Sequence, residues 1–291
     1  MRLKNCWPLT LAMAFLTGCT EEGHEFAAPE GPNVELGVNH DPSLAGNILG
    51  KVVWDGSIPD VPPFQSRTGH ESQAGMPSPG PRANPHAPQV NPGNRGVAHA
   101  VLFLRQVDLR RSRPWDHEPV QVEHRDWKLE VRQGETVSSI GFVRRGESFM
   151  AVSKQKVIHM LRGEGAAFFA LPFADAEVAS AKVLDRKGRV ELSSGADYHW
   201  MRAHLFVDDH PYYACSNDDG QFILTQVPPG VYQVVCWLPN WKVAWQDRNP
   251  ESSHASRVGF RPPLEMPREV TVGPGQSVAV EFVISQKNFG Q

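Results

Sequence analysis

The chain has 291 residues and a formal net charge of −3, from 29 basic and 32 acidic side chains. Residues of both signs are interspersed, so no basic patch indicates a nucleic-acid partner. The length is sufficient for one large or two small domains with a hydrophobic core. Because the sequence lacks a Gly-x-Ser-x-Gly elbow, a phosphate-binding loop and a His-Glu-x-x-His zinc helix, we predict that the protein is not an enzyme.

Residues 1–18 have the layout of an export signal. Arg2 and Lys4 precede an apolar run from Trp7 to Phe15 that is too short to span a bilayer. The following Leu-Thr-Gly-Cys19 segment resembles the lipobox of bacterial lipoproteins, which implies removal of residues 1–18 and a lipid on Cys19. We therefore expect a lipid-anchored protein of the bacterial cell envelope. Thr20, which is not an aspartate, favours delivery to the outer membrane, facing the periplasm or the cell surface.

Two segments have the composition of unfolded chain. Residues 19–45 are rich in Glu, Gly, Pro and Asn without apolar periodicity, which predicts a disordered tether. A strand is expected over residues 46–54, and a second Pro-rich interval follows at about 59–95. This interval contains almost no large apolar residues, so we predict a disordered insertion.

From residue 97 onward, short apolar runs alternate with Gly, Pro and charged turns, and no long segment has helical periodicity. This pattern predicts an all-β protein built as a Greek-key β-sandwich. Strands are expected in the runs 97–104, 121–131, 137–143, 147–152, 165–171, 182–184, 204–207, 212–214, 221–224, 231–237, 269–272 and 278–284.

The segment from Asn217 to Val234 predicts two tight turns between strands. Asp219-Gly220 favours a hairpin turn, after which Phe222 and Leu224 share one face of a strand. Pro228-Pro229-Gly230 then sets the next turn. The whole segment resembles carboxypeptidase regulatory-like, or prealbumin-like, β-sandwich modules, and this resemblance implies fold much more than function.

Residues 198–214, from Tyr198-His199-Trp200-Met201 through His210-Pro211-Tyr212, resemble cupredoxin-like proteins of the methylamine-utilisation type. In that family, Cys, His and Met at three-residue spacing and one upstream His hold copper. Here Gly195 stands at the Cys position and Tyr198 at the His position, while His159 and Met201 correspond to the upstream His and the Met. The resemblance therefore implies a degenerate remnant without a bound metal or other cofactor, and electron transfer through copper is an alternative.

The sequence around Asp208-Asp209-His210 places two carboxylates and an imidazole close together. We favour a role in capping the turn before Pro211, because adjacent residues on a strand face opposite sides. Hydrolysis is the alternative, and it requires Asp209 or His210 as a general acid or base.

Trp237, Trp241 and Trp245 fall within nine residues, directly after a strand. Exposed indole rings on the edge of a sandwich could stack on sugar rings, which gives carbohydrate binding as an alternative function. Packing over the open end of the sandwich is the structural interpretation, and we favour it. Cys215 and Cys236 are the two cysteines of the folded part, and they could form a disulfide in an oxidising compartment.

These patterns and resemblances together imply three parts after cleavage of the signal peptide. The tether at 19–45 leads to a cupredoxin-like sandwich at 46–200 with its Pro-rich insertion, and this sandwich merges with a carboxypeptidase regulatory-like sandwich at 201–291. The predicted role is binding or structural and not enzymatic. Its expected partners are the membrane, through lipid on Cys19, and a cell-wall polysaccharide or an envelope protein.

Overall fold

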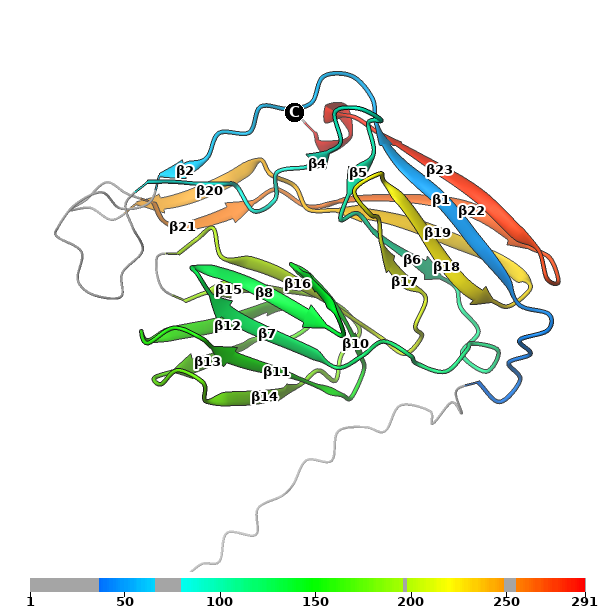
Figure 1. Cartoon of the computed structure of the whole chain (residues 1–291), viewed down its shortest axis with the longest axis horizontal. Coiled ribbons are helices and arrows are strands. Elements are labelled where there is room, and N and C mark those ends of the chain that lie inside the picture. Colours follow the sequence, from blue (N-terminus) through cyan, green and yellow to red (C-terminus); the bar gives the residue numbers. More distant parts are fainter. Residues whose placement is uncertain (1–36, 66–79, 196–197, 249–254, 291) are drawn as a thin grey trace, which may run out of the picture. The chain divides into compact units, whose positions relative to one another are not determined.

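The computed structural model describes residues 37–65, 80–195, 198–248 and 255–290. These residues form β-strands and one short 3₁₀ helix, so the prediction of an all-β sandwich is confirmed (Figure 1). Among the described residues, no helix is long and apolar enough to cross a membrane. The predicted signal peptide, Cys19 and Thr20 lie outside the described residues.

Strands from both ends of the chain build one β-sandwich, which we call the host sandwich. Its three-stranded sheet has the order β18 (Gln221–Val227), β1 (Gly46–Trp54) and β23 (Ser277–Ile284). The facing sheet has the order β17 (Tyr213–Cys215), β6 (Val101–Arg105), β19 (Gly230–Leu238) and β22 (Leu264–Val272). β1 therefore lies between two strands from the C-terminal part of the chain.

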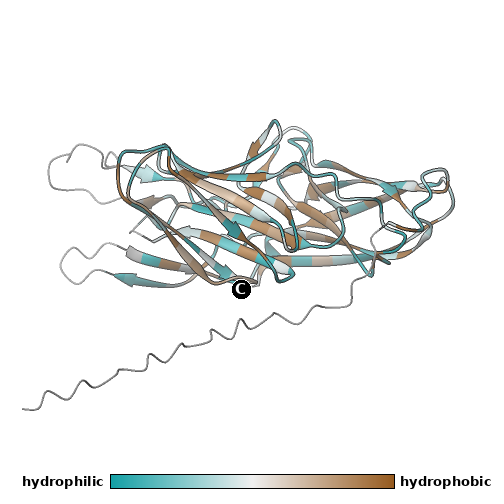
Figure 2. Ribbon diagram, turned by 90° about the horizontal axis from the view of Figure 1, so that it is seen from below, coloured by the Kyte–Doolittle hydropathy of each residue, from teal (hydrophilic) through white to brown (hydrophobic). Residues whose placement is uncertain are grey.

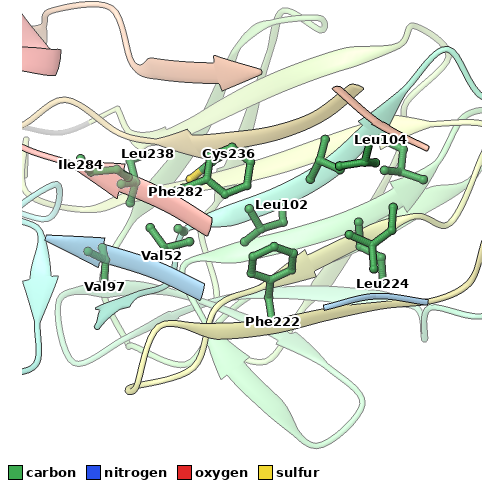
Figure 3. Close-up of a cluster of buried hydrophobic side chains, with 14 of the residues drawn as sticks. Val52, Val97, Leu102, Leu104, Phe222, Leu224, Cys236, Leu238, Phe282 and Ile284 are labelled. Carbon is green, nitrogen blue, oxygen red and sulfur yellow. The ribbon is translucent and has the colours of Figure 1, made fainter. Parts of the chain in front are cut away.

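The core of the host sandwich follows from the two-residue period of its strands. Ile48 and Val52 on β1 are fully buried, whereas Leu49 between them is exposed. Phe222 and Leu224 on β18 point into the same core, as the sequence predicted (Figure 3). Alternation of hydrophobic and hydrophilic residues is visible along several strands in Figure 2. Each large apolar side chain in this core contributes about 1.5–3 kcal/mol by leaving water.

All strands of a second sandwich lie in the single stretch 120–208, between β6 and β17, and we call it the inserted sandwich. One sheet has the order β14 (Ala179–Val183), β11 (Ser148–Ser153), β7 (Val120–Arg125), β8 (Lys128–Gln133) and β9 (Thr136–Ser138). The other has the order β10 (Ile140–Arg144), β16 (Arg202–Asp208), β15 (Gly188–Ser194), β12 (His159–Gly165) and β13 (Phe169–Phe173).

The two sandwiches meet through a separate apolar cluster. Val101 and Phe103 of β6 and Trp237 of β19 pack against Phe142 of β10 and Phe206 of β16. Because β6 faces the host core on one side and this cluster on the other, the run Val101–Leu104 is buried at every residue. The junction thus accounts for strands that read as continuous apolar runs.

The predicted domain boundary at 200/201 differs from this arrangement. β1 and β6, which were assigned to the first sandwich, pair with C-terminal strands of the host sandwich. β16, which was assigned to the second sandwich, belongs to the inserted one. The boundary was wrong because partner strands can be far apart in the chain: Asn47 of β1 pairs with Ser277 of β23.

The prediction of disorder is wrong for the described parts of the Pro-rich interval. Four two-residue strands occur in or beside it, and the side chains of Asn84 and His86 are buried. Asn84 Nδ2 donates to the carbonyl of Trp241 at 2.9 Å, and Asn84 Oδ1 accepts from the amide of His86 at 2.9 Å. Polar side chains therefore fix a segment that lacks large apolar residues.

We call residues 80–90 the strap; residues 66–79 lie outside the described part. The short strands are β2 (Phe64–Gln65), β3 (Pro81–Arg82), β4 (Gln89–Val90) and β5 (Val97–Ala98).

The end of the predicted tether is also ordered. The amide of Gly37 donates to the carbonyl of Leu109 at 3.1 Å, and the amide of Asn39 donates to the carbonyl of Arg110 at 2.8 Å. Residues 37–45 therefore belong to the folded part, and the prediction of disorder is wrong for them. The earlier part of the tether lies outside the described residues.

The two turns near Gly220 and Gly230 connect strands of different sheets, so the predicted hairpin is a crossing between sheets. β17 and β19 lie in the four-stranded sheet, whereas β18 between them in sequence lies in the three-stranded sheet. The Gly220 amide donates to the Asn217 carbonyl at 2.8 Å, and the Gly220 carbonyl accepts from the Val52 amide at 2.8 Å.

The remaining elements are the ribbon of β20 (Val243–Arg248) with β21 (Ala255–Phe260) and the helix η1 (Gln286–Phe289).

Candidate functional site

The predicted copper remnant lies in the inserted sandwich. The rings of His159 and Tyr198 are neighbours, with centroids 6.0 Å apart. Met201, which follows Tyr198 closely in the sequence, is fully buried in the core of the same sandwich. Gly195 donates its amide to the carbonyl of Met160 at 2.7 Å. Gly195 and Tyr198 supply neither the thiolate nor the second imidazole that copper requires. The residues present therefore do not fit a cupredoxin copper site.

A second imidazole that the sequence interpretation missed lies against His159. His124 of β7 stacks on it with ring centroids 4.8 Å apart, and both side chains are buried. Their ring nitrogens have no hydrogen-bond partner among the described residues. Burial lowers the pKa of His124 to about 3, so this ring is neutral at pH 7. The alternation Val120, Val122, His124 indicates an inward position. Across the described part of the chain, no group of three or more His, Cys, Asp and Glu side chains is arranged to hold a metal ion.

Cys215 and Cys236 are free thiols on strands that β6 separates. Cys215 pairs with Val101 and Cys236 with Leu102, so the two cysteines are two strands apart and face opposite sides of the sheet. Neighbouring strands are about 4.8 Å apart, whereas a disulfide requires Cα atoms closer than about 7 Å. The disulfide that the sequence allowed is therefore incompatible with this sheet.

The three tryptophans do not form an exposed platform. Trp237 is buried at the junction of the sandwiches, and Trp241 is buried against Trp54 and Phe289. Trp245 alone of the three is half exposed, on β20. Two of the rings predicted for carbohydrate binding therefore serve as packing.

Asp208, Asp209 and His210 belong to an ion-pair network at the edge of the inserted sandwich that faces β17. Lys187 Nζ lies 3.1 Å from Asp208 and 2.7 Å from Asp209, and the Tyr213 hydroxyl donates to Asp208 at 2.9 Å. Burial alone would raise the pKa of Asp209, but hydrogen bonds from Lys187 and Arg145 hold that pKa below its usual value. The Asp209 amide donates to Asp208 Oδ1 at 2.8 Å, and the Tyr212 amide donates to His210 Nδ1 at 3.3 Å.

A cleft of about 450 Å³ opens between the sandwiches next to this network. Its apolar floor contains the buried rings of Phe103, Phe206 and Tyr213. Charged side chains line its rim: Arg105, Lys187, Arg189 and Glu265. Arg105 and Glu265 form an exposed ion pair of 2.6 Å between β6 and β22. We call this the inter-sandwich cleft.

A second cavity, of about 310 Å³, shares Arg189 and Trp237 with the cleft. It is also lined by His86 of the strap, by Glu191 and His204 of the inserted sandwich, and by Asn240, Phe260 and Arg261. We call it the arginine cavity. Sequence reasoning missed Lys187, which directly precedes β15, and Arg189 and Glu191, although the alternation of the last two with Val190 and Leu192 places them on one polar face of β15.

A chain of hydrogen bonds crosses the arginine cavity. Arg189 Nη1 lies 3.3 Å from His204 Nδ1, His204 Nε2 lies 3.3 Å from His86 Nε2, and His86 Nδ1 lies 3.2 Å from the carbonyl of Asn240. Because a guanidinium can only donate and a carbonyl can only accept, the direction of every bond is fixed. His204 therefore carries its proton on Nε2, and His86 carries its proton on Nδ1. Both rings are neutral in this chain.

No protein family, curated protein or solved structure was found to match this chain.

Proposed function

We propose that this chain is a lipid-anchored protein of the bacterial cell envelope with a non-enzymatic binding role, and that its ligand, a cell-wall polysaccharide, occupies the inter-sandwich cleft. The observation that carries the proposal is the combination of an aromatic floor with a charged rim in one cleft of about 450 Å³. Sites for small ligands combine apolar walls with a few directed polar groups in this way. The lipobox-like segment ending at Cys19 supports the anchor.

The binding role is tested with the full chain in non-ionic detergent and soluble oligomers of N-acetylglucosamine as the probe. We expect saturable binding, seen by calorimetry, that weakens in an Arg105→Ala, Glu265→Ala double variant because the rim loses both charges. The matched control is Arg144→Ala, Glu147→Ala, an exposed pair in the inserted sandwich that does not line the cleft rim. Equal weakening in both double variants, or no binding by the unmodified chain, would contradict the proposal.

The anchor is tested separately by expressing the full chain in a bacterium with a labelled fatty acid. We expect label on the protein and recovery in the membrane fraction, both abolished by Cys19→Ser. The matched control, Cys6→Ser, removes the other cysteine of the N-terminal segment and should leave both unchanged. Label that persists in Cys19→Ser would refute lipidation at this residue.

A further inference from the structure

We infer that the arginine cavity binds an oxyanion group, a carboxylate or a phosphate, between Arg189 and Arg261. This inference rests on the proposed binding role, because the cavity adjoins the inter-sandwich cleft through Arg189 and Trp237. The ligand therefore carries an acidic group that binds in the arginine cavity, while a neighbouring part of the same ligand binds in the inter-sandwich cleft.

The first support is the distribution of charge around Glu191. Arg202 donates to Glu191 Oε1 at 2.9 Å, and its other nitrogens donate to the carbonyls of His199 and Val258. Each of the three guanidinium nitrogens of Arg202 thus donates a hydrogen bond. Glu191 also pairs with Arg189 at 3.2 Å, so its single negative charge is shared by two arginines, and no other carboxylate of the cavity lining balances Arg189 and Arg261.

The second support is the set of donors that lack acceptors. Arg189 uses Nη1 for both Glu191 and His204, and its Nη2 and Nε have no hydrogen-bond partner among the described residues. The side chain of Arg261, which is exposed, likewise has no hydrogen-bond partner in the described part of the chain. An oxyanion would accept from these guanidinium nitrogens, because a guanidinium matches carboxylate and phosphate with two parallel hydrogen bonds.

The third support is how Arg189 is held. Its guanidinium lies over the ring of Trp237, 5.5 Å from the centroid, and its Nη1 is fixed by Glu191 and His204. The remaining edge of the guanidinium is therefore oriented before a ligand arrives, which lowers the entropic cost of binding. A metal ion between His86 and His204 is a poorer occupant, because Arg189 already donates to His204 and would face a second cation.

The neutral imidazole pair gives the site a pH dependence. The groups that face His86 and His204 are Glu191, Arg189, Arg202 and Arg261, together with the carbonyl of Asn240. Burial lowers the pKa of His86 to about 4. A bound anion favours protonation of His86 at Nε2, which replaces the hydrogen bond from His204, so binding takes up a proton, and by linkage the affinity for the anion rises as the pH falls from 7 to 5.

The experiment is calorimetry on the full chain in non-ionic detergent with three probes: galacturonate oligomers, inorganic phosphate and neutral N-acetylglucosamine oligomers. We expect galacturonate, whose carboxylate stays ionised over this interval, to bind more tightly at pH 5 than at pH 7, and we compare phosphate with it at pH 7 alone because phosphate loses charge as the pH falls. We also expect Arg261→Gln to weaken that binding about tenfold, the effect of losing one charge-assisted contact. Arg268→Gln is the matched control, since this exposed arginine of β22 does not line the cavity. Thermal melting checks that both variants fold.

The outcomes separate this inference from the proposed function. Two results would contradict the anion site but not ligand binding in the inter-sandwich cleft. One is binding of neutral oligomers while both anions fail to bind, and the other is equal weakening by Arg261→Gln and Arg268→Gln. Failure of all three probes would overturn both. A preference for galacturonate over phosphate, or the reverse, identifies which oxyanion the cavity takes.

Discussion

Gly220 occupies a position where a larger residue meets two separate obstacles. Its φ of +76° lies in the left-handed region, which strains residues with a side chain by about 1–3 kcal/mol. A Cβ atom at this position would also lie 2.2 Å from the carbonyl oxygen of Val52. The turn at Gly220 therefore lies in direct contact with the backbone of β1 in the host sandwich.

We expect Gly220→Ala to lower the free energy of unfolding by more than the backbone strain alone. Gly146→Ala is the matched control, because Gly146 has a similar φ of +86° but nothing within 4 Å of an added Cβ. Urea denaturation of both variants measures the difference, which isolates the contact with Val52. Equal losses would show that the turn can shift away from β1 without cost.

At the residue scale, sequence patterns predicted the positions that obey a strand's two-residue period. Phe222 and Leu224 were placed on one face correctly because Gln221–Leu224 alternates. His86 could not be placed this way, since its burial depends on Asn240 and His204, which are distant in sequence. Trp241 was ambiguous for the same reason: only its partners, Trp54 and Phe289, decide whether it is exposed.

At the scale of elements, the strap is held by side chains more than by strand pairing. We expect Asn84→Ala to cost about 1–3 kcal/mol, because the mutation leaves the buried amide of His86 without its acceptor. Hydrogen exchange should accelerate locally in residues 80–90. The control is Gln89→Ala, an exposed residue of the strap, which should leave exchange near the wild-type rate. Unchanged exchange in Asn84→Ala would mean that other contacts hold residues 80–90 in place without the Asn84 side chain.

The strands β17, β6 and β19 make a prediction about thiols. Burial raises the pKa of Cys215 to about 12 and also raises that of Cys236, so the native protein should react very slowly with thiol reagents at pH 8. Two thiols should appear when a form beginning at Thr20 is unfolded in urea without reductant. Absence of both thiols under these conditions would reveal a disulfide and a different strand order.

At the scale of the whole molecule, buried imidazoles should make stability depend on pH. Burial lowers the pKa of His86 to about 4 and that of His124 to about 3, and it also lowers the pKa of His204. In the unfolded chain these groups take up protons near pH 6.5, whereas in the folded chain they stay neutral. The stability contribution is therefore complete above pH 6.5 and is lost as the pH falls toward 4.

For His86 alone this contribution is about 3 kcal/mol. We expect the free energy of unfolding in urea to fall strongly between pH 7.5 and pH 4.5. His124→Phe keeps a ring in the core but removes one titrating group, so its loss over the same interval should be smaller. A loss identical to that of the wild-type chain would exclude His124 from the acid response.

The fold class followed from local patterns, but the connection of the strands did not. Short apolar runs with turns between them are enough to predict sheets, because each strand needs only its own alternation. The nesting of one sandwich within the other depends on pairs such as Asn47 with Ser277, which no local pattern records. The cleft and the arginine cavity are products of that nesting, and so their lining could not be assembled from the sequence.

The central position of β1 has a consequence for the order in which the chain folds. β1 has β18 on one side and β23 on the other, so its pairing is complete only after β23, the last strand, has been synthesised. The inserted sandwich is encoded in one uninterrupted stretch and has no such delay. On the ribosome, nascent chains that end before Ser277 should therefore contain a protease-resistant inserted sandwich while the host sandwich is still digestible.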